Sequence, residues 1–116
     1  MKNNALICRF ACAFSGIYSA ARSESSFRLQ IVAAVAVIVF LCWRQPSAIW
    51  WAVVALTIGA VLAAELFNTA LERVIDHLHP ASHPLIKVAK DCAAGGVLVL
   101  SLAAIAVFVA LIMASF

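Results

Sequence analysis

The last part of the chain, from Cys92 to Phe116, contains no charged side chain. A transmembrane helix needs roughly 20 mainly apolar residues, so this stretch is long enough to cross a bilayer with some tilt. The composition agrees, because 66% of the 116 residues are hydrophobic and only 11% are charged, whereas a soluble domain carries roughly 25% charged residues. The sequence therefore predicts an all-α membrane protein.

Two further apolar runs precede this stretch. The first, Ile31 to Trp43, is extended backwards by Phe27, and the second begins near Ile49. Proline-containing segments separate the runs, and proline disfavours a continuing helix. We therefore expect three membrane-spanning helices within 27–43, 49–76 and 85–116, with a loop at 77–84.

The N-terminal part differs from the three spans. Apolar residues from Ala5 to Ala21 alternate with Arg9 and two serines, which is typical of an amphipathic helix in the membrane interface. We expect this surface helix over about 5–26. Residues 1–116 would then form one membrane-embedded domain.

Basic residues indicate the orientation, because cytoplasmic loops are enriched in lysine and arginine. Seven basic residues lie before the first span or around the second loop, and Arg44 lies on the other side. The N-terminus and loop 77–84 are therefore expected in the cytoplasm and the C-terminus outside, in a cytoplasmic (inner) membrane. The seven residues are Lys2, Arg9, Arg22, Arg28, Arg73, Lys87 and Lys90.

Four polar residues form a stripe along the second predicted span. They lie at i, i+3, i+7 and i+11, which places them on one helix surface. A charge inside a membrane helix costs at least about 2.5 to 3.5 kcal/mol, so such residues are functional candidates by default. The stripe consists of Glu65, Asn68, Glu72 and Asp76.

Depth in the membrane distinguishes the carboxylates. The deeper Glu65 is desolvated, which makes it a stronger base toward a hydroxyl arriving from the lipid phase. Glu72 lies nearer the interface and, with Glu24, suits Mg²⁺, which prefers oxygen ligands and stays bound to nucleotide phosphates. A purely structural polar seam between helices is the alternative interpretation.

The third predicted span opens with Lys87, Lys90 and Asp91, followed by small residues from Ala93 to Gly96. Cations and close backbone approach at a helix start favour a phosphate, and such charge stabilisation dominates phosphoryl transfer. The sequence has neither a Walker A motif nor the glycine-rich loop of protein kinases.

These segments, AELFNTALERVIDHL and HPLIKVAKDCAAGGVLV, together with ARSESSFRLQ, resemble the small prokaryotic diacylglycerol kinase and undecaprenol kinase family. The resemblance covers nearly the whole chain. It implies a homotrimeric lipid kinase of three-span subunits with an N-terminal surface helix, which uses ATP and Mg²⁺ at sites shared between subunits. No nucleic-acid partner is expected.

The resemblance also implies residue roles by motif position. Glu65 corresponds to the general base, which also contacts the lipid, and Asn68 to its polar neighbour. The metal carboxylates are Glu24 and Glu72, which also lie at the nucleotide. Lys90 binds phosphate, Asp76 and Asp91 lie on the nucleotide side, and Arg9 and Gln30 match polar positions assigned to the lipid substrate.

The implied reaction converts diacylglycerol to phosphatidic acid. The alternative is an undecaprenol kinase making undecaprenyl phosphate, because the segment CAAGG after Asp91 looks closer to that branch. Two other classes stay open from the residues alone. One is a small oligomeric pore or proton-conducting protein lined by Glu65 and Glu72. The other is an adaptor whose basic loop binds anionic headgroups.

Overall fold

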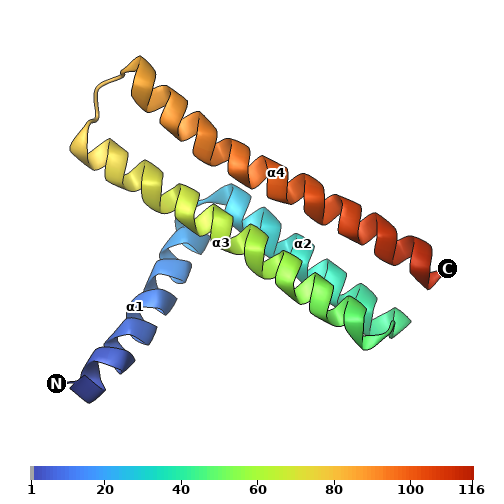
Figure 1. The fold of residues 1–116 in the computed structure, drawn as a ribbon. Helices are drawn as coiled ribbons and strands as arrows, with labels where there is room; N and C mark the ends of the chain where they lie inside the picture. Colours follow the sequence, from blue (N-terminus) through green and yellow to red (C-terminus); the bar gives the residue numbers. More distant parts are fainter. Residues whose placement is uncertain (1) are drawn as a thin grey trace.

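The computed structural model describes the backbone of residues 2–116 and the side chains of residues 5–116, so the side chain of Lys2 lies outside the described part. It contains four helices and, within this range, no strand. The helices are α1 (Lys2–Ser23), α2 (Ser25–Arg44), α3 (Ala48–Leu78) and α4 (Pro84–Ser115). The long helices α2, α3 and α4 run alongside one another, whereas α1 leaves them at a steep angle (Figure 1).

Three of the helices, α2, α3 and α4, are long and apolar enough to cross a membrane, which confirms the predicted all-α membrane fold. The 31 residues of α3 make a helix of about 46 Å, longer than the roughly 30 Å hydrocarbon core. One end of α3 therefore extends beyond the apolar layer. The last turns of α3 carry Glu72, Arg73 and Asp76, which suit that extension, whereas Glu65 lies further back in the helix.

The corner between α1 and α2 lies at Glu24, whose backbone is extended (φ −110°, ψ 111°). The expected surface helix over 5–26 therefore ends three residues earlier, at Ser23. Arg28 explains this position, because its guanidinium donates hydrogen bonds to the carbonyls of Ala21 (3.0 Å) and Arg22 (2.9 Å). These carbonyls belong to the last turn of α1, where the helix offers them no backbone donor.

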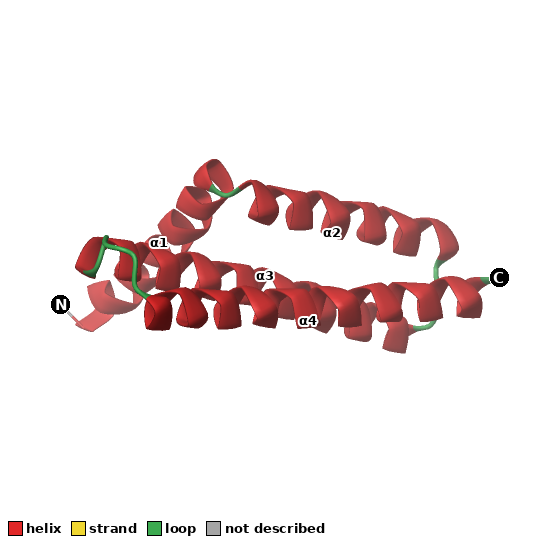
Figure 2. Cartoon of the chain, turned by 90° about the horizontal axis from the view of Figure 1, so that it is seen from above, coloured by secondary structure: helices red, strands yellow, loops and turns green. Residues whose placement is uncertain are grey.

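The turn between α2 and α3 is short, and Gln45 closes α2 in the left-handed region with φ 47°. The neighbouring Arg44 joins this turn to the far end of α4. Its guanidinium donates to the carbonyl of Ser115 and lies 4.1 Å from the ring centroid of Phe116. The α2–α3 turn and the C-terminal end of α4 therefore meet at one end of the molecule (Figure 2).

The connection from α3 to α4 covers 79–83 and is shorter than the expected 77–84, because α3 continues to Leu78 and α4 begins at Pro84. His83 is the N-cap of α4, and its Nδ1 accepts a hydrogen bond from the backbone N–H of Leu85 at 3.1 Å. Pro84 follows in the first helical position, which its fixed φ favours. These two residues define the start of α4.

The buried core is small and lies near the end at which α2 meets α3. Its main cluster consists of Leu41, Val54 and Leu111, which are at most 3% exposed, and Ala20, Phe27 and Val61 are also buried. Only 17% of the apolar window of α2, 17% of that of α3 and 6% of that of α4 are buried. Most of the apolar helix surface of a single chain is thus available to lipid or to other chains.

Candidate active site

Glu65 is the most buried charged side chain among the described residues, with 3% of its surface exposed. Its Oε2 accepts a hydrogen bond from the Ser26 hydroxyl of α2 at 3.0 Å. The Thr69 hydroxyl, one turn further along α3, donates to the backbone carbonyl of Glu65 at 2.9 Å. The structure therefore holds a carboxylate between α2 and α3, with one hydroxyl donor bonded to it.

Asn68, the predicted neighbour of Glu65, lies where α3 packs on α4. It lines a groove of about 420 Å³ whose walls also include Phe67, Ala93 and Gly96. Its Oδ1 atom is buried and has no hydrogen-bond partner within the described residues. A buried polar atom without a partner is uncommon in a native interior, so Oδ1 of Asn68 is available to accept a hydrogen bond from a group bound in the groove.

Two ion pairs lie at the charged end of α3 and α4. The ammonium of Lys90 contacts Oδ1 of Asp76, which joins the two helices across loop 79–83. Lys87 pairs with Asp91 at 2.7 Å, one turn apart on α4. The structure thus brings Lys90 to the acidic stripe of α3, while Asp91 contacts Lys87.

Glu24 and Glu72 are half-buried, and neither carboxylate accepts a hydrogen bond or joins an ion pair among residues 5–116. Their segments approach each other through Arg73, whose guanidinium donates to the hydroxyls of Ser19 (2.9 Å) and Ser23. Ser23 adjoins Glu24 and Arg73 adjoins Glu72. Two unpaired carboxylates are thus carried by neighbouring segments.

This donor set fits Mg²⁺, which is commonly bound by one or two carboxylates together with phosphate oxygens and waters. The described side chains contain no group of three or more His, Cys, Asp or Glu that could hold a metal alone. Loop histidines do not form one either, since His79 contacts the carbonyl of Ala81 and His83 caps α4. Nucleotide phosphates would have to complete a magnesium site at Glu24 and Glu72.

The two residues matched to the lipid substrate differ in their surroundings. Gln30 donates a hydrogen bond from Nε2 to the Ser101 hydroxyl of α4 at 3.0 Å. Arg9 is exposed on α1 and forms no hydrogen bond or ion pair with the side chains described. A single chain therefore brings Gln30 to the helix bundle but does not bring Arg9 to the other candidate residues.

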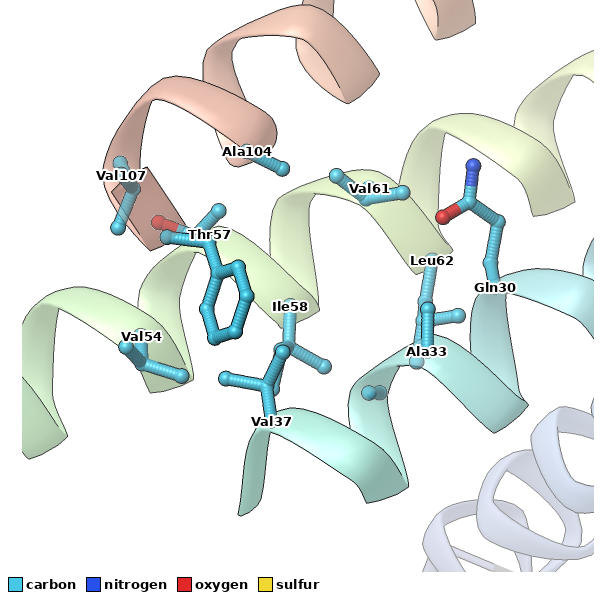
Figure 3. Close-up of a pocket in the computed structure, with 12 residues that line it drawn as sticks. Gln30, Ala33, Val37, Val54, Thr57, Ile58, Val61, Leu62, Ala104 and Val107 are labelled. Atoms are coloured by element: carbon cyan, nitrogen blue, oxygen red, sulfur yellow. The ribbon is translucent and has the colours of Figure 1, made fainter. Parts of the chain in front are cut away.

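An apolar cavity of about 80 Å³ lies between α2, α3 and α4. Figure 3 shows Val54 toward one end and Gln30 at the other, with Val61 and Leu62 close to Gln30. Leu62 and Glu65 are three residues apart on α3 and therefore adjacent on its surface. The cavity thus begins about one helical turn from the buried carboxylate.

Sequence reasoning missed Ser26, Ser101 and the role of Arg73. An isolated serine or a surface arginine has no distinctive sequence pattern, so the sequence did not indicate which residues these side chains would contact. A weak signal existed, because Ser26 and Gln30 lie four residues apart and share a face of α2. Both side chains of that face make polar contacts with other helices.

A sequence profile of the family described as prokaryotic diacylglycerol kinase matches residues 11–113. The chain belongs to this family. It is a membrane lipid kinase and therefore a phosphotransferase. Family membership favours an enzyme over the pore and the adaptor that the residues alone left open.

Among the similar proteins is an undecaprenol kinase of Bacillus subtilis strain 168, 41% identical over 90 residues, which cover 78% of this chain and 73% of that protein. A diacylglycerol kinase of Synechocystis sp. is 42% identical over 103 residues, covering 88% of this kinase and 59% of its relative. A diacylglycerol kinase of Escherichia coli K12 is 29% identical over 92 residues, covering 79% and 75%. This kinase thus spans somewhat more than half of the Synechocystis protein.

Proposed function

We propose that this kinase transfers the γ-phosphate of ATP to the primary hydroxyl of diacylglycerol, forming phosphatidic acid, with Glu65 as the general base. The observation that carries the proposal is the Glu65 carboxylate, 3% exposed in an apolar helix bundle. Family membership supports the reaction class. A base at this depth suits a hydroxyl that is delivered by a lipid.

The apolar cavity supports a lipid acceptor. Its walls are almost entirely aliphatic and aromatic, and Leu62, close to Gln30 at one end of the cavity, lies one helical turn from Glu65 on α3. A lipid whose hydroxyl reached the Glu65 carboxylate could lay part of its chain along Leu62, Ile58 and Val54, away from water. Gln30 would then mark the boundary between the polar head and the chain.

The reaction moves a proton from the lipid hydroxyl to Glu65 and a phosphoryl group from ATP to the lipid oxygen. Glu65 takes the hydroxyl proton as the lipid oxygen forms a bond to the γ-phosphorus of ATP, and the bond from that phosphorus to the β,γ-bridging oxygen breaks to release ADP. Direct transfer needs no phosphoenzyme. The proton on Glu65 subsequently returns to solvent.

Negative charge on the transferring phosphoryl group is stabilised where α3 ends and α4 begins. We assign phosphate binding to Lys90, whose pairing with Asp76 holds its ammonium at the end of the acidic stripe. Asp76 and Asp91 are assigned to the nucleotide side. A cation fixed before phosphate arrives stabilises charge without reorganisation during the reaction.

Glu24 and Glu72 would hold Mg²⁺ together with the ATP phosphates. The ion, when bound, neutralises phosphate charge as it develops. The two glutamates are suited to this because no side chain among residues 5–116 pairs with them. Arg73, bonded to Ser19 and Ser23, fixes α1 and the α1–α2 corner against the segment that carries Glu72.

We also propose that the active enzyme is a homotrimer in the cytoplasmic membrane, with its N-terminus and loop 79–83 in the cytoplasm and its C-terminus outside. The orphaned Oδ1 of Asn68 and the groove beside it support completion of the site by another subunit. Arg9, which is remote from the other candidates within one chain, would contribute only in such an assembly.

A second acceptor is favoured by one specific observation. The segment CAAGG after Asp91 resembles the undecaprenol kinase branch, and the Bacillus subtilis relative carries that name. Undecaprenol also presents a primary hydroxyl on a long apolar chain. The same residues would phosphorylate it to undecaprenyl phosphate.

One assay tests both acceptors. The purified protein in lipid nanodiscs receives Mg²⁺ and ATP labelled in the γ-phosphate, with diacylglycerol and undecaprenol offered in parallel and in competition. Preferential labelling of diacylglycerol supports the first assignment, and preferential labelling of undecaprenol replaces it with the second. Labelling of neither, in protein that binds ATP, would contradict both acceptors.

The isosteric variant Glu65→Gln tests the base. We expect turnover to fall by at least about a thousandfold, while ATP binding persists because Glu65 is assigned to the acceptor and not to the nucleotide. Circular dichroism and ATP affinity serve as controls for folding. Full activity of Glu65→Gln would refute the assignment of the base.

A further inference from the structure

We infer that Ser26 is a positioning residue that holds the Glu65 carboxylate in its reactive orientation, an inference that rests on the proposed role of Glu65 as the base. Ser26 is the second residue of α2, and Glu65 lies in the middle of α3. The two residues are 39 positions apart in sequence. Their contact therefore exists only because the α1–α2 corner places the start of α2 against α3.

The hydrogen bond from Ser26 Oγ to Glu65 Oε2 is 3.0 Å long. It is the only hydrogen bond to the Glu65 carboxylate among residues 5–116, since Thr69 donates to the backbone carbonyl of Glu65 instead. A buried carboxylate without a donor is costly, and a flexible side chain would rotate to find one. The Ser26 hydroxyl supplies that donor and so selects one orientation.

The two carboxylate oxygens of Glu65 therefore have different roles. Oε2 is occupied by the Ser26 hydroxyl, while Oε1 accepts no hydrogen bond from the described side chains. A carboxylate accepts through both oxygens, so Oε1 remains available for the lipid hydroxyl. Fixing the base before the substrate arrives removes an entropic cost from the proton-transfer step.

Ser26 also connects the base to the proposed magnesium site. Glu24 lies two residues before Ser26, at the corner where α2 begins. Because both side chains come from this short segment, a shift of the corner would displace them together. The geometry thus lets one backbone element place a metal carboxylate and orient the base.

Loss of the hydroxyl should slow the chemical step and leave ATP binding intact. We expect Ser26→Ala to lower kcat about tenfold with the KM for ATP unchanged. Ser25→Ala is the matched control, because Ser25 is the neighbouring serine, exposed like Ser26, and makes no side-chain hydrogen bond with the described residues. Its kcat should equal that of the wild type.

A pair of nearly isosteric variants separates the hydroxyl from the shape. Ser26→Thr keeps the donor and should retain most of kcat, whereas Ser26→Val lacks it and should resemble Ser26→Ala. This comparison also holds if truncation to alanine destabilises the protein. Wild-type kcat in both Ser26→Ala and Ser26→Val, or equal loss in the threonine and valine variants, would overturn the inference.

The Glu65→Gln variant, assayed alongside, distinguishes a failure of the proposed role of Ser26 from a failure of the proposed base. Inactive Glu65→Gln combined with unaffected Ser26→Ala would overturn the role of Ser26 and leave the base in place. Active Glu65→Gln would overturn both. Inactive Glu65→Gln with a tenfold slower Ser26→Ala, rescued by threonine, is the expected result.

Discussion

Lys90 of α4 and Asp76 of α3 form an ion pair that joins the two helices across loop 79–83. Their side chains are 33% and 63% exposed, and a solvent-exposed pair contributes at most about 1 kcal/mol to stability. The importance of this contact is therefore positional. It keeps an ammonium at the end of the acidic stripe, where a nucleotide phosphate is proposed to bind.

Lys90→Met should impair catalysis far more than stability. We expect the KM for ATP to rise about tenfold or more, with the unfolding temperature changed by only about a few degrees. Steady-state kinetics and thermal unfolding in the same nanodiscs measure the two effects. Lys87→Met is the matched control, since Lys87 is exposed and pairs with Asp91 on its own helix. Equal effects of the two substitutions would contradict a specific role for Lys90.

Glu72→Gln should raise the magnesium requirement. The neutral amide is a weaker ligand for a hard cation than the carboxylate, so the Mg²⁺ concentration for half-maximal activity should increase about tenfold at saturating ATP. Glu24→Gln should act in the same direction. A magnesium titration of initial rates measures both variants. An unchanged titration midpoint in both would refute their assignment as metal carboxylates.

Arg73→Ala should loosen α1. The substitution removes the hydrogen bonds to Ser19 and Ser23, and hydrogen exchange in the last turns of α1 should accelerate about tenfold. Arg73→Lys should give an intermediate rate, because lysine lacks the forked donor geometry of arginine. Arg22→Ala is the control, since the Arg22 guanidinium lies over Tyr18 of its own helix at 5.8 Å. Unchanged hydrogen exchange in Arg73→Ala would show that the hydrogen bonds from Arg73 to Ser19 and Ser23 do not stabilise α1.

Ala34→Leu should hinder the acceptor lipid. Ala34 lines the apolar cavity, and three added carbon atoms would occupy part of its volume. We expect the KM for the lipid to rise about tenfold while the KM for ATP stays constant. Ala36→Leu makes the same change on α2 at an exposed position that does not line the cavity. If both variants use lipid like the wild type, the cavity does not hold the acceptor chain.

Several contacts could be anticipated because they depend on neighbours in sequence. The pair Lys87–Asp91 follows from i,i+4 spacing on a helix, and His83 and Pro84 stand where a helix start is expected. The corner at Glu24 was less predictable. It depends on Arg28 reaching back to the carbonyls of α1, and no proline or glycine marks the break.

The sequence by itself determined the three membrane-spanning helices and the polar stripe of α3, because apolar length and helical periodicity are local properties that the membrane environment enforces. Only the tertiary structure decided which polar groups meet. Four features depend on how the helices pack and on the angle of the corner at Glu24. They are the hydrogen bond from Ser26 to Glu65, the hydrogen bonds from Arg73 to α1, the ion pair of Lys90 with Asp76 and the cavity that ends at Gln30. Those relations join residues on different helices, so hydrophobic periodicity along any one helix leaves them undetermined.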